Sequence, residues 1–435
     1  MYQKLIEYFE SRSVLILGFG REGRSTYAFI RKYYPDKPLG VADIKRVDIE
    51  DENVRVFSGD GYLDAVKRYD LVMQSPGISM CDVDASDSVE ISGQTDLFLR
   101  FVACETVGVT GTKGKTTTSS LIYEILLAAQ KPACLIGNIG VPVFDSLADL
   151  EGKTAVIEMS SHQLEFVKAS PHIAVLTNIY EEHLDHYNGM TGYVNAKLNI
   201  YRFQNETDFF IFNPDQNMSA FFDLNDVKAK IIPVSSKEGE KSEFHQSLTV
   251  LNERLKGTHN SQNIYFAAAA ANCLGISNEA VKLGIENFKG IEHRLELVGV
   301  FKGVKFYDNS IATIPTAVML DIEALADVSS LIIGGMDRGI DYSGFVESLE
   351  ESGIQNLICL PDTGHSIGKE LMKRGSSLRI ILAADMEEAV KSAFELTRAG
   401  HSCLLSPAAS SYNRYKDFEE KGRHFKALVR ELGAL

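Results

Sequence analysis

The stretch Gly108–Thr118, GVTGTKGKTTT, decides the fold of the central part of the chain. A short β-branched run enters a glycine-rich turn, and a stretch of helical period, TTTSSLIYEILLAAQ, follows. Such a turn points backbone N–H groups at a phosphate, and the helix N-terminus adds a partial positive charge. The strict phosphate-loop pattern has a glycine where this chain has Val109. A glycine turn that contains a lysine by chance is disfavoured, because a strand precedes the turn and a helix follows it. We therefore expect a phosphate loop made of Gly111, Thr112, Lys113, Gly114, Lys115, Thr116 and Thr117.

Outside this loop, short β-branched runs alternate with stretches of helical period along the whole chain. The runs VLILGFG, TAVIEMSS, HIAVLTNI, SLIIGG, NLICLP and RIILAA each lead into a segment of helical character. The order strand, helix, strand predicts an α/β fold of parallel sheets with crossover helices. Seams near Gly93–Thr106 and Gly290–Leu297 predict three domains, over residues 1–93, 94–294 and 295–435.

Composition limits the classes of function. The 435 residues carry 44 Lys plus Arg against 59 Asp plus Glu, a net charge of −15, which argues against a nucleic-acid-binding surface. Hydrophobic residues make up 45% and charged residues 24%, so a folded protein with a large core is expected rather than a disordered chain. Six cysteines without a CxxC pair, no signal-peptide pattern and no long apolar run predict a cytoplasmic protein that does not bind membranes.

A second glycine motif lies near the N-terminus, in VLILGFGREGRS. Gly18, Gly20 and Gly23 match G-x-G-x-x-G after a strand, and Asp43 follows at the end of the next expected strand. The motif is typical of a nicotinamide or flavin dinucleotide site, and hence of an oxidoreductase. A turn that serves packing alone, or a site for a different diphosphate, fits the same residues. The sequence at this position leaves the three interpretations open.

A carboxylate, an imidazole and an amine form the third signal. Glu158 ends the expected strand TAVIE, and His183 follows the expected strand HIAVL in a loop, so both belong to the carboxyl edge of the parallel sheet. They supply ligand types that suit the Mg²⁺ of a bound nucleotide. Lys197 shares a helical face with Tyr193 in YVNAKLNIY. An ammonium beside divalent cations is repelled, whereas a neutral amine could react with CO₂ to form an anionic carbamate. From the sequence alone, a solvated helix face is the favoured interpretation of Lys197.

These motifs, taken in order, resemble one known family. GTKGKTT, EMSSHQLE, TNIYEEHLDHY and YVNAKLNIY are followed by HNSQN, GIEHRLE and LSPAASSYNRYKDFEEKG, with SPGIS at Ser75 and GNIGVP around Asn138. The chain resembles the Mur ligase family over nearly its whole length, and most closely the members that add D-glutamate to UDP-N-acetylmuramoyl-L-alanine. The resemblance implies an N-terminal Rossmann-like domain for the UDP substrate, a central P-loop domain for ATP and a C-terminal Rossmann-like domain for the amino acid.

The resemblance also implies a mechanism and a set of site residues. The substrate carboxylate would attack ATP to give an acylphosphate, which glutamate then attacks, with two Mg²⁺ sites and no macromolecular partner; we expect a monomer. The catalytic and metal-binding residues would be Lys115, Thr116, Glu158, His183 and a carbamylated Lys197. Nucleotide contacts outside the loop would be Asn260, Asn263, Arg294 and Asn309. The UDP substrate would contact Gly18, Phe19, Gly20, Asp43, Ser75, Pro76, Gly77, Asn138 and His183. Glutamate would contact Thr313, Arg338, Ser411 and Phe418.

The C-terminal part departs from the family pattern at two places. The family motif Asp-Ser-Lys-Ala-Thr-Asn is replaced by the stretch from Asn309 to Ile314, with Ile311 in place of the lysine and Asp308 adjacent to the changed aspartate. Arg338 stands where a lysine for the glutamate α-carboxylate is expected, and arginine differs from lysine in geometry as well as size. These changes keep three alternatives open: a related ligase that adds L-glutamate, a divergent paralogue, and a nucleotide-binding module without catalysis. The oxidoreductase interpretation leaves the phosphate loop without a role.

Overall fold

The computed structural model describes residues 2–80, 83, 88–138, 141–182, 186–187, 189–215, 221–235, 237, 242–255, 258–325 and 327–434. The chain divides into two compact units, residues 1–289 and 290–435. This division falls a few residues before the boundary predicted at 294/295. The further division predicted at 93/94 stays a prediction, because the first unit is compact as a whole.

The first sheet of unit 1 is parallel, with strand order β3-β2-β1-β4-β5. Its central strand β1 is the expected run VLIL and is buried along its whole length. The strand order reverses between β1 and β4, and in sheets of this kind ligands bind at the carboxyl ends of the strands beside such a reversal. The elements are α1 (Gln3–Glu10), β1 (Val14–Leu17), α2 (Arg21–Tyr33), β2 (Leu39–Asp43), β3 (Val54–Ser58), β4 (Leu71–Gln74), β5 (Glu90–Ser92) and α3 (Gln94–Phe101).

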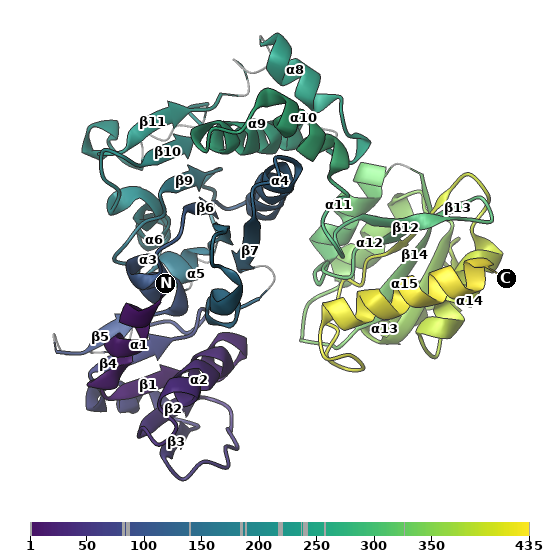
Figure 1. Ribbon diagram of the computed structural model, residues 1–435. Helices are drawn as coiled ribbons and strands as arrows, with labels where there is room; N and C mark the ends of the chain where they lie inside the picture. Colours follow the sequence, from purple (N-terminus) through teal and green to yellow (C-terminus); the bar gives the residue numbers. More distant parts are fainter. Residues whose placement is uncertain are drawn as a thin grey trace. The chain divides into compact units, whose positions relative to one another are not determined.

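The second sheet of unit 1 is also parallel, with order β11-β10-β9-β6-β8-β7. The strand that enters the glycine-rich turn, β6, lies between β9 and β8, and α4 packs against α9 and α10 (Figure 1). The elements are β6 (Thr106–Thr110), α4 (Lys115–Ala128), β7 (Ala133–Gly137), β8 (Thr154–Glu158), α5 (Ser161–Leu164), β9 (Ile173–Leu176), α6 (Met190–Arg202), β10 (Phe209–Phe212), β11 (Lys230–Pro233), α8 (Glu243–Thr249), α9 (Thr258–Cys273) and α10 (Asn278–Asn287).

One hydrophobic cluster joins the two sheets of unit 1. Phe144, on a 3₁₀ turn after β7, is buried and stacks at a tilt on Phe29 of α2, with the ring centroids 4.8 Å apart. Phe9 of α1 meets the same ring edge-on at 6.4 Å. The hydroxyl of Ser25 adds a hydrogen bond of 2.6 Å to Asp145. This continuous core explains why residues 1–289 form one compact unit.

Unit 2 contains one mixed sheet, with order β12-β13-β17-β14-β15-β16. Its strands are parallel except for β12, which forms an antiparallel hairpin with β13 that the strand–helix alternation did not predict. Both turn residues, Lys302 (φ 52°) and Gly303 (φ 79°), are left-handed, as a two-residue hairpin turn requires. The elements are β12 (Glu296–Phe301), β13 (Val304–Asp308), α11 (Pro315–Leu325), β14 (Val328–Gly335), α12 (Ser343–Glu351), β15 (Asn356–Asp362), α13 (Thr363–Arg374), β16 (Arg379–Leu382), α14 (Met386–Leu396), β17 (Ser402–Leu405) and α15 (Phe418–Ala434).

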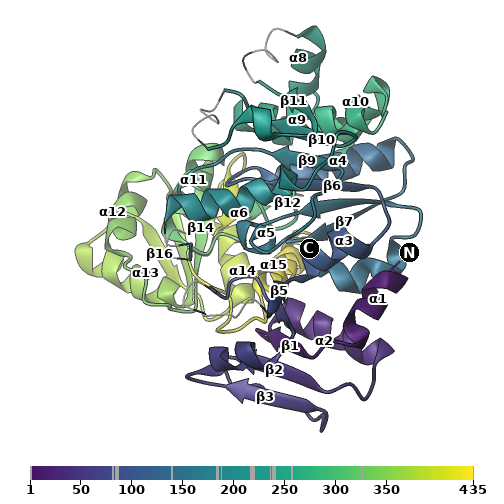
Figure 2. The same cartoon turned by 90° about the vertical axis from the view of Figure 1, so that its left-hand side faces the viewer.

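Alternate residues of these strands face two separate cores. Leu331 and Ile333 of β14 pack with α11, α12 and α13, whereas Ile332 packs with α14 and α15. Figure 2 shows α12 and α13 on one side of β14 and β16, and α14 and α15 on the other. The α/β architecture of parallel sheets predicted from the sequence is therefore confirmed, with helices on both faces of this sheet.

The structure also describes the state of five cysteines and the character of the helices. The five cysteines within the described ranges are free thiols. Among the same residues, no helix combines the length and the apolar character needed to cross a bilayer.

The first prediction concerns the core that joins the two sheets of unit 1. We expect Phe144→Ala to lower the free energy of unfolding by about 3–5 kcal/mol, because a buried aromatic ring is lost and a cavity remains. Leu127→Ala, at a half-exposed position of α4, is the control and should change it by less than about 1 kcal/mol. Urea unfolding followed by circular dichroism measures both, and an equal effect of the two variants would contradict the shared core.

Candidate functional site

The glycine-rich turn lies between β6 and α4 and has no room for side chains at two positions. Gly111 has φ +151°, and a Cβ there would collide with the hydroxyl of Thr177. Gly114 has φ +82°, and a Cβ there would collide with the side-chain amide of Asn263. Both glycines are therefore required by close approach as well as by backbone conformation. The predicted strand–turn–helix arrangement is present in the structure.

The lysine of the loop folds back over it. Lys115 Nζ donates to the carbonyl oxygens of Gly111 (2.8 Å) and Thr112 (2.9 Å). Thr116 and Thr117 follow in the first turn of α4, where backbone N–H groups lack partners within the helix, and Thr116 is buried. This arrangement offers an anion the N–H groups of the first turn of α4 and one ammonium.

The segment after β9 holds the loop in place, and sequence reasoning missed it. Asn178 accepts from the backbone N–H of Lys113 (2.8 Å) and donates from Nδ2 to its carbonyl (2.9 Å), so one amide pairs with both groups of one residue. Thr177 Oγ1 donates to the same carbonyl at 2.7 Å. The backbone N–H of Thr112 donates to the Asn178 carbonyl, and that of Tyr180 donates to Thr112 Oγ1, each at 2.9 Å. The signal that could have identified them is two polar residues directly after an apolar strand beside β6.

Glu158 ends β8, next to the strand that enters the loop, and is only 1% exposed. Its Oε1 accepts from Asn138 Nδ2 at 2.7 Å, and Asn138 follows the neighbouring strand β7. Its Oε2 is buried and has no hydrogen-bond partner among the described residues. A buried carboxylate oxygen without a donor is costly, and a divalent cation is a ligand that would satisfy it. The donor set here therefore fits Mg²⁺.

Lys197 is buried, which corrects the expectation of a solvated helix face. Its side chain is 1% exposed, because α6 packs this face against the loop, and Nζ donates to the Gly111 carbonyl at 2.8 Å. The ammonium lies 4.7 Å from the ring centroid of Tyr193, and the Tyr193 hydroxyl lies 2.9 Å from Thr112 Oγ1. Burial, reinforced by the charge of Lys115, lowers the pKa of Lys197 well below its usual value. The structure thus favours the neutral amine.

Two further predictions in the second sheet have different outcomes. Asn263 lies beside α4, where its Oδ1 accepts from Thr118 Oγ1 at 3.3 Å and its Nδ2 donates to Asn260 at 3.3 Å. Both predicted asparagines are therefore brought together at the loop. His183, predicted as a metal ligand and substrate contact, lies outside the described residues.

The first sheet brings its predicted residues together at the carboxyl ends of β1, β2 and β4. Asp43 accepts from the backbone N–H of Phe19 at 2.7 Å, and Ser75 Oγ donates to the carbonyl of Gly18 at 2.8 Å. Gly18 has φ +87°, and Gly23 sits so close to it that a Cβ would meet the Gly18 carbonyl. Gly23 thus serves close packing of α2, while the turn itself lies at the carboxyl end of β1, beside that of β4. Gly20, Pro76 and Gly77 border the same two turns.

In unit 2, Asn309, which replaces the aspartate of the family motif, is hydrogen-bonded to a carboxylate on α11, that of Asp321. Asn309 Nδ2 donates to Asp321 Oδ2, and Ser406 Oγ donates to the same oxygen at 2.8 Å. Burial raises the pKa of Asp321 to about 6, although these two hydrogen bonds oppose the shift. Asp308, the neighbour that could have replaced the family aspartate, is fully buried and bound to His293 Nδ1 at 2.7 Å.

The residues predicted for glutamate follow three strands of this sheet. Arg338 is exposed after β14, Thr313 lies after β13, and Ser411 and Phe418 come after β17. Ser411 is buried, and its hydroxyl has no hydrogen-bond partner among the described residues. Sequence reasoning missed Lys421, which is 1% exposed and donates from Nζ to Gly334 O at 2.6 Å. Burial lowers the pKa of Lys421 to about 7.

Comparisons with known proteins agree with this geometry. The Mur ligase middle domain model matches residues 109–271, and the model "Mur ligase, glutamate ligase domain" matches residues 293–409. A protein of Symbiobacterium thermophilum named UDP-N-acetylmuramoylalanine--D-glutamate ligase is 35% identical over 401 residues, 87% of this chain and 88% of that protein. The chain belongs to the Mur ligase family.

Another curated protein and two solved structures are similar to this chain over nearly its whole length. A protein of the same name from Acetivibrio thermocellus is 30% identical over 98% of this chain and 97% of its own length. The solved structure of UDP-N-acetylmuramate-alanine ligase MurC from Thermotoga maritima has a TM-score of 0.55 at 18% identity, covering 97% of this chain and 100% of that chain. MurF ligase from Thermotoga maritima in complex with ADP has a TM-score of 0.54 at 16% identity, covering 99% and 100%. At these identities the two structures show a shared fold.

The pairing between Asn178 and Lys113 gives a second prediction. Asn178→Ala leaves the N–H and carbonyl of Lys113 with fewer partners, so the loop loses its fixed shape and the affinity for ADP should fall roughly tenfold. Asn199→Ala is the matched control, because its amide also donates to two carbonyls but on the far side of α6, at Leu164 and Glu165. Titration calorimetry measures both affinities, and an unchanged affinity in Asn178→Ala would contradict the role of this pairing.

Proposed function

We propose that this chain is an ATP-dependent ligase that joins D-glutamate to UDP-N-acetylmuramoyl-L-alanine through an acylphosphate. The observation that carries the proposal is the meeting of three groups at one sheet edge: the phosphate loop, the buried Lys197 and the unsatisfied oxygen of Glu158. The names of relatives that match along most of the chain supply the substrates. An oxidoreductase built on the Gly18 turn is not favoured, since those relatives are named as ligases.

In this proposal the second sheet binds ATP. The N–H groups at the start of α4 and Lys115 receive the β- and γ-phosphates, and Lys115 leaves its two carbonyl partners to do so. Asn260 and Asn263, which lie against the loop, contact the nucleotide. Lys115 then offsets the negative charge that spreads over the transferring phosphoryl oxygens when the substrate carboxylate attacks.

Thr116, Glu158, His183 and Lys197 are the residues that would hold Mg²⁺, at two sites. The fit is supported by the unsatisfied Glu158 oxygen and by the low pKa of Lys197, whose neutral amine can add to CO₂ and become an anionic carbamate. Bound Mg²⁺ would supply Lewis-acid stabilisation of the phosphoryl oxygens. The chain itself shields both ligands from water and holds them in place. Asn138 holds Glu158 through a hydrogen bond, and the packing of α6 holds Lys197.

We assign the other two substrates to the other two sheets, in a monomer of three functional parts. The turns at Gly18, Phe19, Gly20, Asp43, Ser75, Pro76 and Gly77, with Asn138 and His183, would bind the UDP substrate. Thr313, Arg338, Ser411 and Phe418 would bind glutamate. The unsatisfied, buried hydroxyl of Ser411 supports this assignment, because a carboxylate is an acceptor that it lacks among the described residues.

Phosphate release tests the proposal. The protein is mixed with ATP, Mg²⁺ and UDP-N-acetylmuramoyl-L-alanine, and D- or L-glutamate is added in separate reactions. We expect release with D-glutamate only. Release with L-glutamate only would assign the chain to the L-glutamate-adding ligases, and no release with either would contradict a ligase.

The carbamate makes a fourth prediction. Lys197→Ala should lose activity by at least about a hundredfold and recover part of it when formate or acetate is added, because a small carboxylate replaces the missing anion. Lys228→Ala, at an exposed position, should keep its activity and should not respond to these acids. Full activity of Lys197→Ala, or loss without any recovery in a folded variant, would contradict the carbamate.

A further inference from the structure

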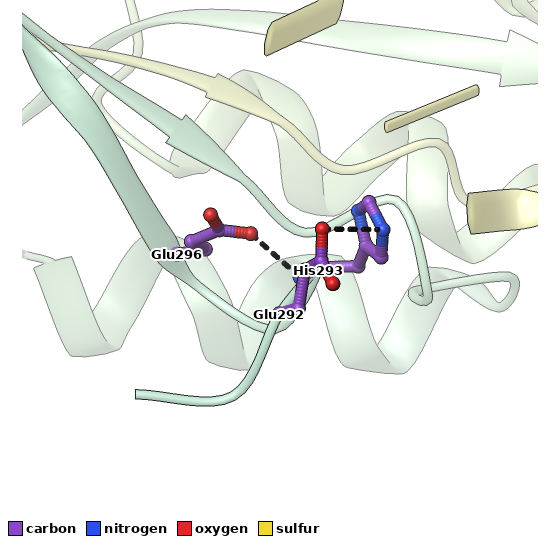
Figure 3. A group of neighbouring side chains, drawn as sticks. All are labelled: Glu292, His293 and Glu296. Atoms are coloured by element: carbon purple, nitrogen blue, oxygen red, sulfur yellow. Dashed lines mark hydrogen bonds and ion pairs between the residues drawn. The ribbon is translucent and has the colours of Figure 1, made fainter. Parts of the chain in front are cut away.

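Two glutamates and a histidine meet at the start of unit 2, where the chain turns into β12. Glu292, His293 and Glu296 each offer one ligand atom, and these three atoms lie within 4.8 Å of one another. Figure 3 shows the Glu292 carboxylate facing the His293 ring, and Glu292 Oε1 lies 3.5 Å from Nε2 of that ring. Two ligands of one tetrahedral Zn²⁺ ion are roughly 3.4 Å apart when each bond is about 2.1 Å long. The spacing of these two atoms therefore suits a single metal ion.

The imidazole of His293 brings an unused lone pair to this group. Its Nδ1 donates to Oδ2 of the fully buried Asp308 at 2.7 Å, so the ring proton is on Nδ1 and Nε2 presents its lone pair on the side of Glu292. The histidine is 3% exposed, and Nε2 has no hydrogen-bond partner among the described residues. A histidine that binds a metal commonly donates its other ring N–H to a carboxylate in this way.

The chain fixes these ligands before any ion binds. His293 (φ 63°) and Leu295 (φ 44°) are left-handed although neither is glycine, and such conformations persist only where the surrounding structure holds them. The backbone N–H of His293 donates to Glu296 Oε2 at 2.9 Å, and that of Leu295 donates to Asn309 Oδ1 at 3.1 Å. Gly422 of α15 packs so closely on the ring that a Cβ there would collide with His293 Nδ1. Ligands held in this way lose little conformational entropy on binding.

A cation already lies between the two carboxylates, the ammonium of Lys426. Its Nζ lies 2.7 Å from Glu292 Oε1 and 2.8 Å from Glu296 Oε2. The ammonium pairs with both carboxylates, whereas Nε2 of His293 receives no hydrogen bond from the described residues. A divalent transition-metal ion can bind all three groups and carries twice the charge. Because Glu292 is 65% exposed and the lysine stem is flexible, the ammonium can turn out to water at this edge.

We propose that Glu292, His293 and Glu296 form a binding site for a divalent transition-metal ion of the Zn²⁺ class, which displaces the ammonium of Lys426. Imidazole together with carboxylates favours Zn²⁺ over Mg²⁺, which prefers oxygen ligands, and three protein ligands leave a fourth position for water. The site lies wholly within unit 2 and does not rest on the proposed ligase activity. The ion and the contact of Lys426 with the turn before β12 are alternatives, so metal binding releases α15 from this turn at that residue.

Titration calorimetry of the whole protein with ZnCl₂, in excess MgCl₂, tests the site. Glu292→Gln, at an exposed position, removes one charged ligand and should weaken Zn²⁺ binding at this site at least about tenfold. Glu387→Gln is the matched control, because Glu387 is 58% exposed and pairs with Lys391 at 2.6 Å on α14. It should leave the Zn²⁺ affinity unchanged. Any Zn²⁺ bound in unit 1 is common to these proteins, so the difference between the two variants measures this site alone.

Lys426→Met distinguishes a metal site from a group of ion pairs that only supports the fold. The variant removes the competing cation, so Zn²⁺ should bind at least about tenfold more tightly than to the wild-type protein. It also leaves two carboxylates without their ammonium, so its melting temperature should fall in the absence of Zn²⁺ and recover when Zn²⁺ is added. Lys305→Met is the control, because Lys305 pairs with Asp327 at 2.9 Å elsewhere in unit 2 and its loss should not change Zn²⁺ binding.

The proposal is overturned if wild-type protein and Glu292→Gln bind the same number of Zn²⁺ ions with the same affinities. Zn²⁺ binding by folded Lys426→Met that is no tighter than that of the wild-type protein would overturn it as well. Lys426→Gln, which keeps a hydrogen-bond donor for the carboxylates, gives the same comparison if Lys426→Met does not fold. None of these measurements uses ligase turnover, so a failure of the proposed function leaves them intact.

Discussion

The site in unit 1 depends on the close approach of two backbones at Gly111. Strands β6 and β9 are neighbours in parallel register, with Thr110 beside Leu176, so the residues that follow the two strands must meet. They meet so closely that a side chain at 111 would collide with Thr177. The same approach lets Asn178 pair with Lys113 and lets Lys197 reach the Gly111 carbonyl. The shape of the phosphate loop, the burial of Lys197 and the position of Lys115 thus follow from one spacing between strands.

This spacing has an electrostatic consequence. Lys115 and Lys197 both donate to the carbonyl oxygen of Gly111. Two ammonium groups that share one acceptor lie close together and repel each other. Burial is the main cause of the lowered pKa of Lys197, and the charge of Lys115 lowers it further. Because the folded state holds this proton less tightly than the unfolded state, burying Lys197 costs stability at low pH, and this cost shrinks as the pH rises from its lowered pKa toward its usual value. A protein of net charge −15 can therefore bind polyanions through placed cations, and the total charge does not decide affinity.

The sequence was sufficient where local pattern determines structure. The alternation of strands and helices predicted the parallel sheets, and G-x-G-x-x-G together with Asp43 predicted a turn in which Asp43 does bind the Phe19 N–H. It was insufficient where a residue's environment is made by segments distant in the chain. Lys197 looks like a surface lysine until the loop 86 residues earlier packs against it, and Asn178 gains its role only because β9 lies beside β6. The hairpin of β12 and β13 was missed because the runs around it were interpreted as strands of parallel βαβ units.

The change at residue 309 shows how such distant contacts alter the meaning of a motif. Compared with the family pattern, Asn309 looks like the loss of a carboxylate from the carboxyl edge of the third sheet. In the structure a carboxylate is present there, because Asp321 reaches the same place from α11 and accepts from Asn309 and Ser406. Asn178 and Asn309 then share one property: each is an amide that must donate and accept at once to fix the backbone of a turn that carries a cation. The residue type at 309 is therefore determined by the partner at 321, and the departure from the motif rearranges the charges of this edge without removing them.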